Sequence, residues 1–494
     1  MSVYSMWFRQ AAQGEWLFKN RYEIPAHSGG YFSICWGLFG QLGGLLRLSP
    51  LQIFQVIRWF SVLLLLGAFG WVSDSLIEDR WLRKLWVVLF GLGGSFGGWL
   101  FLLGRKVLSH AQIIHTAADL WSPIHPFFSI AFIPHFPFAL AWFLLANGAW
   151  LSGERTKKKS LYVVSGVCIV ISGLTHPYEM MTFGGTLVGV TLLRKMQKRK
   201  IGQSLWSLFP LVGILGIMGY YFWLTHLHPG FRAWKNNFTA TYPIWIILLG
   251  GGPVLWLGLA ELFYLLKRLR SLTMKEQWLF VWGTLSPVLL YARFLPFAFS
   301  FSTSLMLPHY FLSGRWLSRR SALRRWDVKA GTVIVTLALT LTSFLLVWEA
   351  LMLPKTAFSR ALFVEEDSEL DPIFIPLPIK EGMVWLGRHA AKDTVVLGAW
   401  ETLLQIPTYA DTYVFVGHKD FSSDRYRKKL AILTFFNVTT SNEWRKSFLD
   451  REKINYLFWG PKERLAGDFR PDISPLLRGV YSKNDVSIYT VRSQ

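Results

Sequence analysis

About ten long apolar segments run along this chain, and the hydrophilic loops between them alternate in character. One set of loops is dense in Lys and Arg and falls at 155–159, 194–200, 267–270 and 315–329. The other set has little clustered charge and carries His, Pro and single acids, at 119–125, 175–179 and 226–242. Because Lys and Arg resist translocation, basic loops stay in the cytoplasm. The alternation therefore predicts a multi-span membrane protein whose non-cytoplasmic side carries the chemistry.

The charge distribution excludes the usual interpretation of a basic protein. The formal net charge is +22, with 32 basic and 12 acidic residues before Lys355 and 20 and 18 from there on. The excess sits in short loops between apolar segments, which favours cytoplasmic anchoring with membrane-lipid contact and excludes nucleic-acid binding. The two cysteines, Cys35 and Cys168, lie in apolar surroundings and indicate neither a redox compartment nor a metal site.

A helix of roughly 20 apolar residues crosses a bilayer. Spans are predicted near 54–73, 84–103, 127–150, 160–175, 178–193, 205–225, 242–266, 277–293, 295–313 and 330–352. The stretch 31–46 is apolar but short and Gly-rich, which favours an interfacial helix. With the loop 155–159 inside, the count of spans places both residues 1–30 and residues 353–494 outside.

The chain is expected to divide into four parts. These are a first external loop with interfacial helices (1–53), a multi-span domain (54–352), a linker (353–378) and a soluble α/β domain (379–494). In the last part, strands are predicted at 394–399, 413–416, 454–459 and 486–491. Because helices alternate with these strands, a mostly parallel sheet is expected.

Several short motifs together resemble the GT-C superfamily of multi-span glycosyltransferases, and within it bacterial members with a C-terminal extracytoplasmic domain. They are the stretch Tyr4 to Tyr22, Pro134-His135-Phe136, Thr175-His176-Pro177-Tyr178, the run Ala399 to Ala410, Val416-Gly417-His418 and the run Trp459 to Glu463. The resemblance covers nearly the whole chain, although each motif is short.

The resemblance implies an enzyme of the cell (plasma or inner) membrane. Such enzymes transfer a sugar from a polyprenyl-phosphate carrier to a glycan, lipid or protein acceptor on the non-cytoplasmic face. A first-loop carboxylate typically deprotonates the acceptor hydroxyl, and cationic side chains stabilise the departing phosphate. The family's acid would fall just before Val3, at Met1 or Ser2. We expect either that a preceding helix carries this acid or that the protein lacks it.

Three acids are candidate catalytic residues. Asp119 is the leading one, because it is the only acid of the second external loop, where GT-C enzymes often carry an acid that positions acceptor or metal. Glu15 and Glu23 lie in the first loop and would serve as the base if the family's Asp is missing. The structural alternative is a solvated loop acid or a helix cap for Asp119, and a surface carboxylate for Glu15 and Glu23.

Six residues are candidate ligands of substrate or lipid phosphate: His27, His125, His135, His176, Glu179 and Arg293. Polar groups at membrane depth are costly and tend to face a cavity, whereas a histidine beside proline can instead satisfy an unpaired carbonyl. Arg293 is an isolated cation at an outer span end, for which snorkelling is the alternative. No cofactor is evident, and no His-Glu-x-x-His pattern indicates a metal, although a divalent ion is compatible with the resemblance.

Two other functions remain open. A transporter or flippase of lipid-linked or envelope components would be typical of two related halves with broken helices, and no such repeat is evident here. A catalytically inactive GT-C-like scaffold is expected if the first-loop acid is absent.

Overall fold

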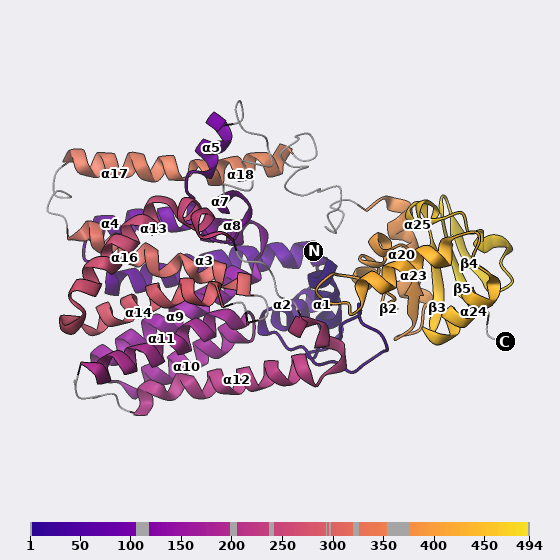
Figure 1. Cartoon of the computed structure of the whole chain (residues 1–494), viewed down its shortest axis with the longest axis horizontal. Helices are drawn as coiled ribbons and strands as arrows, with labels where there is room; N and C mark the ends of the chain where they lie inside the picture. The colour runs from indigo at the N-terminus through magenta and orange to yellow at the C-terminus, as the bar shows by residue number, and fades with distance from the viewer. Residues whose placement is uncertain are drawn as a thin grey trace. The chain divides into compact units, whose positions relative to one another are not determined.

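The computed structural model describes residues 2–104, 118–197, 205–236, 242–292, 294–295, 298–319, 326–352 and 375–492. The chain is mostly helical with one small sheet near its C-terminus (Figure 1). It forms two compact units. Unit 1 contains residues 1–53, 221–237 and 367–494, and unit 2 contains residues 54–220 and 238–366.

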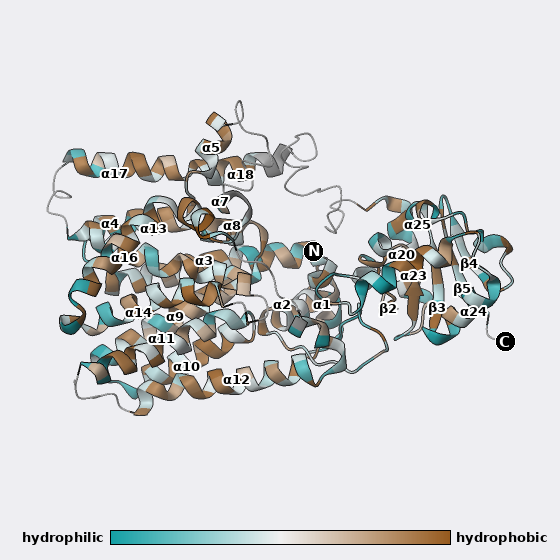
Figure 2. Ribbon diagram, in the orientation of Figure 1, coloured by the Kyte–Doolittle hydropathy of each residue, from teal (hydrophilic) through white to brown (hydrophobic). Residues whose placement is uncertain are grey.

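Unit 2 is a helical bundle, and brown residues are frequent along its helices in Figure 2. Helices occur at all the predicted spans. The α-helices from Pro50 to Met352 are α3 (Pro50–Leu76), α4 (Arg80–Leu92), α5 (Gly97–Gly104), α7 (Ala118–Trp121), α8 (Pro126–Phe132), α9 (His135–Thr156), α10 (Lys159–Gly173), α11 (Pro177–Met196), α12 (Phe209–His226), α13 (Ile244–Lys267), α14 (Met274–Leu290), α15 (Ser302–Leu305), α16 (Leu307–Ser318), α17 (Trp326–Leu339) and α18 (Leu341–Met352). Of these, α7 lies between two predicted spans, and the end of α12 belongs to unit 1.

Among the described residues, five helices are long and apolar enough to cross a membrane. They are the helices at 50–76, 135–156, 205–226, 244–267 and 326–348. A sixth is reached if α4 and α5, which are bent by 58° at a short break, form one span. The other predicted segments are helical but shorter or less apolar, so the total of about ten spans stays a prediction.

The described parts of the four basic loops meet at one end of unit 2. Arg194 lies 3.7 Å from the carboxylate of Glu154, and the Gln197 side-chain amide donates to the carbonyl of Leu269 at 2.6 Å. Arg319, from the fourth loop, pairs with carboxylates of α13 and α14. This end of the bundle is called the basic end below. Its composition is what the positive-inside rule requires of loops that share one side.

Unit 1 joins the N-terminal helices to the C-terminal domain. Its helices are α1 (Ser2–Ala12), α2 (Ile34–Leu45), α20 (Leu377–His389), α21 (Trp400–Leu403), α22 (Ile406–Tyr409), α23 (Arg425–Phe436), α24 (Asn442–Arg451) and α25 (Pro461–Ala466). Its strands are β1 (Val395–Leu397), β2 (Tyr413–Val414), β3 (Ile454–Trp459), β4 (Leu477–Lys483) and β5 (Val486–Val491). All four predicted strands are present; β4 is additional.

The sheet has the order β2-β1-β3-β5-β4. Strands β2, β1 and β3 are parallel, whereas β5 is antiparallel to both β3 and β4. The prediction of a mostly parallel sheet was therefore wrong, and the sheet is mixed. The reason is the β4–β5 hairpin, whose two-residue connection starts at Asn484 with a φ of 52°. Asn tolerates this left-handed backbone, which tight hairpin turns require.

The N-terminal segment contacts this sheet at its β2 edge through one backbone hydrogen bond. The amide of Val414 donates to the carbonyl of Arg21 at 3.0 Å, and helix α1 packs against α22. An open strand edge exposes unpaired amide and carbonyl groups. The first-loop residues therefore satisfy one backbone amide of the edge strand β2.

Candidate functional site

The predicted site residues fall into three groups, two in unit 2 and one in unit 1. The first group surrounds Asp119, which is only 2% exposed in the short helix α7. One carboxylate oxygen, Oδ2, accepts from the amides of Ser95 at 2.8 Å and Gly97 at 3.1 Å, and the Thr342 hydroxyl lies 3.1 Å from it. Asp119 thus satisfies amide groups at the start of α5 that have no partner within the helix.

The second oxygen of Asp119, Oδ1, is buried and has no hydrogen-bond partner in the part of the chain that the structure describes. It faces Gly97 closely: a Cβ there would lie 2.4 Å from Oδ1. A buried carboxylate oxygen without a donor is costly. One oxygen thus caps a helix, as in the structural alternative for this residue, while the other has no donor among the described residues.

His125 belongs to the same group, because it interacts electrostatically with Asp119. It is the residue before Pro126 at the start of α8, and it is 1% exposed. Its Nδ1 is 2.9 Å from the hydroxyl of Tyr310, and its Nε2 is 2.8 Å from the carbonyl of Gly250. The imidazole therefore bridges α8, α13 and α16, which fixes the ring beside Asp119.

The second group contains His135, His176 and Glu179. The Nδ1 atom of His176 lies 2.6 Å from one oxygen of Glu179, and the Thr303 hydroxyl donates to the other oxygen at 2.8 Å. The ring of His135 is 6.3 Å from that of His176. All four side chains are buried. The Thr-His-Pro-Tyr turn thus sets an acid–imidazole pair at the start of α11, a pair in which a proton can move between oxygen and nitrogen.

The third group, in unit 1, contains Glu23 and His27. Glu23 accepts from the amide of Ser423 at 2.6 Å and lies 3.9 Å from Lys428. Burial raises the pKa of Glu23, against the opposing effects of Lys428 and of the amide. The carboxylate of Glu23 is already used to hold the first loop against the start of α23. Glu15 lies half-buried in the turn after α1.

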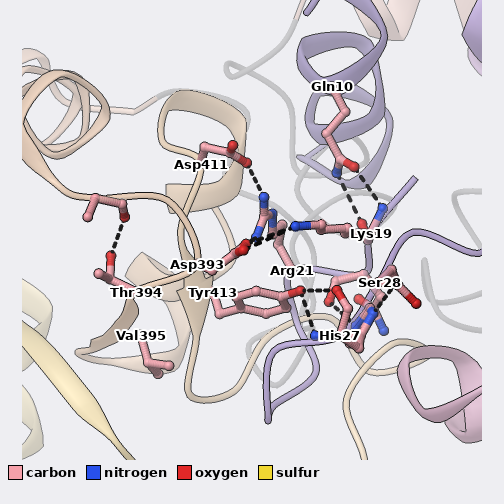
Figure 3. Close-up of polar contacts among 12 residues, drawn as sticks. Gln10, Lys19, Arg21, His27, Ser28, Asp393, Thr394, Val395, Asp411 and Tyr413 are labelled. Atoms are coloured by element: carbon pink, nitrogen blue, oxygen red, sulfur yellow. Dashed lines mark hydrogen bonds and ion pairs between the residues drawn. The ribbon is translucent and has the colours of Figure 1, made fainter. Parts of the chain in front are cut away.

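His27 is positioned by backbone carbonyls on both sides. Its Nδ1 lies 2.8 Å from the carbonyl of Ser28, and its Nε2 lies 3.0 Å from that of Asn20. Its own amide donates to the Tyr413 hydroxyl, which in turn donates to the His27 carbonyl (Figure 3). Burial lowers the pKa of His27. This residue links the first loop to β2.

Sequence reasoning missed the buried arginine at the centre of unit 1. Arg21 is 0% exposed, and its guanidinium pairs with both Asp393 and Asp411, as Figure 3 shows. It also stacks on the Tyr413 ring at 4.6 Å. Arg9 adds a second cation to Asp411 at 3.1 Å. No local signal marks Arg21, because its partners lie more than 370 residues away in the chain.

Lowering the pH is expected to loosen this contact. Burial alone raises the pKa values of Asp393 and Asp411, but the charges and hydrogen bonds of Arg21, with Lys19 and Arg9, outweigh it and lower both. A lowered folded-state pKa gives stability that is present above the unfolded value, about 3.9, and lost as the pH falls through the folded values.

Proteolysis of unit 1 should therefore become faster below about pH 4. A change between pH 7 and about 5 would instead report His27, whose lowered pKa costs stability below its usual value of about 6.5. The raised pKa of Glu23 acts in the opposite direction, because its protonation removes a burial cost. In the variant Asp411→Asn, the rate of proteolysis should increase less below about pH 4. The same increase in this variant as in the wild type would show that other groups cause the loss of stability at low pH.

Arg293 lies outside the described residues, so its predicted role stays a prediction. Within the described ranges, no group of three or more His, Cys, Asp or Glu side chains is arranged to hold a metal ion. The residues missed from sequence are mostly hydroxyl and backbone partners: Ser95, Thr303, Tyr310, Thr342 and the Gly250 carbonyl. Such partners carry no distinctive pattern in the sequence.

No protein-family model and no curated protein matches this chain. Several solved structures are similar to it. The chain is similar to the arabinofuranosyltransferase AftD from Mycobacteria, with 15% identity and a TM-score of 0.59, over 100% of this chain and 39% of that one. It is also similar to ArnT from Cupriavidus metallidurans bound to undecaprenyl phosphate, with 13% identity and a TM-score of 0.52, over 99% of this chain and 92% of that one.

A third similar structure is the oligosaccharyltransferase of Archaeoglobus fulgidus tethered with an acceptor peptide. It has 13% identity and a TM-score of 0.50, over 92% of this chain and 64% of that one. This chain thus spans less than two thirds of the archaeal enzyme and of AftD, but nearly all of ArnT. At these identities the likeness concerns the fold. Over nearly its whole length, the chain has the fold of the GT-C enzymes.

Proposed function

We propose that this protein is a membrane glycosyltransferase that moves a sugar from a polyprenyl-phosphate carrier to an envelope acceptor on the non-cytoplasmic face. The observation that carries the proposal is the GT-C fold over nearly the whole chain, including the near-complete overlap with an enzyme bound to undecaprenyl phosphate. A fold by itself does not fix an activity, so the side chains supply the remaining support.

Two features of unit 2 fit the proposed chemistry. Asp119 offers a buried oxygen that can accept the acceptor's proton, and an alcohol is a poor nucleophile without such a base. The His176–Glu179 pair, with His125 and His135, supplies groups that can hold or return a proton to the departing phosphate. Arg293 is proposed as an additional phosphate ligand.

The proposed orientation in the membrane rests on which segments belong to unit 1 and which to unit 2. The basic loops gather in unit 2, whereas residues 1–53, 221–237 and 367–494 form unit 1. Segments joined in one compact unit share one side of a membrane if the helices between them span it. We therefore propose a multi-pass protein of the cell membrane with about ten spans, an external first loop (1–53), a multi-span domain (54–352), a linker (353–378) and an extracytoplasmic domain (379–494).

The test is sugar transfer by the purified protein in proteoliposomes. Radiolabelled polyprenyl-phosphate sugars are supplied with glycan, lipid and protein fractions of the cell envelope. Transfer of label to one fraction, with release of polyprenyl phosphate, is expected. Movement of the carrier across the bilayer without transfer would instead identify a transporter. Binding of the carrier with neither transfer nor movement would identify an inactive scaffold.

A further inference from the structure

A cavity with many charged side chains in its lining opens at the basic end of unit 2, and neither Asp119 nor its hydrogen-bond partners line it. Its volume is about 580 Å³, within the roughly 300–1,000 Å³ typical of small-molecule sites. It lies between the ends of α3, α4, α9, α14 and α16. The charged side chains that line it include Asp74, Arg83, Glu154, Arg155, Lys275 and Arg315.

Most of these charges are already neutralised within the protein. Arg83 pairs with Asp74. Arg315, whose side chain is 10% exposed, pairs with Glu276 at 2.9 Å. Glu154 accepts from the hydroxyl of Tyr162 at 3.0 Å, and it also pairs with two cations of the neighbouring loops. These pairs form the walls of the cavity and leave little net charge of their own.

Two cations of the lining remain without a carboxylate. In the described part of the chain, neither Lys275 nor Arg155 forms an ion pair. The ammonium of Lys275 donates one hydrogen bond, to the carbonyl of Ser75 at 2.7 Å, so two of its three donors are left. Arg155 is exposed at the end of α9. Among the described residues Glu78 is the single lining acid without an ion pair, although its charge acts on Lys275.

The lining has four cations and four acids, but Glu154 is already paired with Lys157 and Arg194 from outside it. The cavity therefore has a residual positive charge, with donors that belong to two different helices. We propose that it binds a phosphate ester through Lys275 and Arg155, on the side of the membrane opposite to the proposed sugar transfer. A basic pocket between spanning helices on the cytoplasmic side suits the phosphate of a phospholipid head group. A free phosphate in the cytoplasm offers the same chemistry, and the experiment separates the two sources.

The experiment uses the full-length protein, purified in detergent and stripped of lipid. Short-chain phosphatidylglycerol is titrated and bound lipid is counted by native mass spectrometry; in a parallel arm, inorganic phosphate is titrated and the unfolding temperature is followed. The double variant Lys275→Met with Arg155→Gln should bind the phosphate-bearing probe about tenfold more weakly or worse. The variant Lys158→Met removes a cation of the same loop that does not line the cavity, and it should bind as the wild type does.

The variant Glu78→Gln gives a result that a damaged fold cannot produce. Removing this acid raises the positive charge of the cavity, so binding should become tighter while the protein stays folded. Saturable lipid binding that inorganic phosphate does not displace assigns the site to a head group; saturable binding of inorganic phosphate without lipid assigns it to a soluble ligand. Equal binding by wild type and double variant, or no saturable binding of either probe, would overturn the proposal. Both readouts are independent of sugar transfer.

Discussion

Replacing Arg21 with methionine is expected to make the opening of unit 1, in which the first loop leaves the C-terminal domain, easier by about 3 kcal/mol. This value is at the lower end of the cost of breaking a buried ion pair. Methionine keeps most of the apolar contact with Tyr413 but removes the guanidinium that Asp393 and Asp411 share. Those carboxylates would then depend on Lys19 and Arg9 alone. Because each 1.4 kcal/mol is a factor of ten, the opened population should rise about a hundredfold.

The measurement is the rate of limited proteolysis of unit 1 in lipid nanodiscs, which follows the opened population when reclosing is fast. Arg470→Met is the matched control, since Arg470 forms an exposed pair with Asp472 and should change little. Adding Asp393→Asn and Asp411→Asn to Arg21→Met should restore part of the loss, because it removes the stranded charges. If Arg21→Met is cleaved no faster than the control, the buried arginine does not hold the first loop to the C-terminal domain.

Replacing Asp119 with asparagine is expected to reduce sugar transfer by about 10²- to 10⁴-fold, the usual contribution of a general base. The amide oxygen of asparagine can still accept from the Ser95 and Gly97 amides, so the cap at the start of α5 is kept. The charge and the basic second oxygen are lost. Asp119→Asn should therefore fold and bind the carrier normally, and only the transfer rate should fall.

Two further variants separate catalysis from structure. Asp119→Ala also removes the cap, so it should lower the unfolding temperature as well as the activity. Asp74→Asn changes an exposed carboxylate of unit 2 that pairs with Arg83, and its transfer rate should match the wild type. Full activity in Asp119→Asn, together with instability in Asp119→Ala, would reduce Asp119 to a purely structural role and direct the search to Glu179.

Much of the architecture could be predicted from local patterns. The helical segments, the strand at 454–459 and the strand at 486–491 lie where periodicity and composition placed them. The sheet was predicted less well. Strand β4 was not predicted, because five of its seven residues are exposed and it lacks the alternation of a half-buried strand. Its hairpin with β5 turned the expected parallel sheet into a mixed one.

The candidate site was predictable residue by residue but not as an arrangement. The sequence marked Asp119, His125, His176 and Glu179 as unusual polar groups among apolar segments. It did not show that Asp119 caps α5 while keeping one oxygen free, or that Glu179 binds a hydroxyl from α15. Those facts depend on hydroxyl and backbone partners. Such groups occur throughout any sequence, and only the tertiary structure decides which of them lie beside the acids.

The sequence by itself determined the class of protein, because the length of the apolar segments and the charge of the short loops are local properties. Both act directly on insertion into a bilayer. The tertiary structure decided which charges meet. Arg21 joins Asp393 and Asp411 across more than 370 residues, and Lys275 and Arg155 share one cavity from different helices. No sequence periodicity predicts such pairs, because two charges interact only when the packing of helices and sheet brings them within a few ångströms.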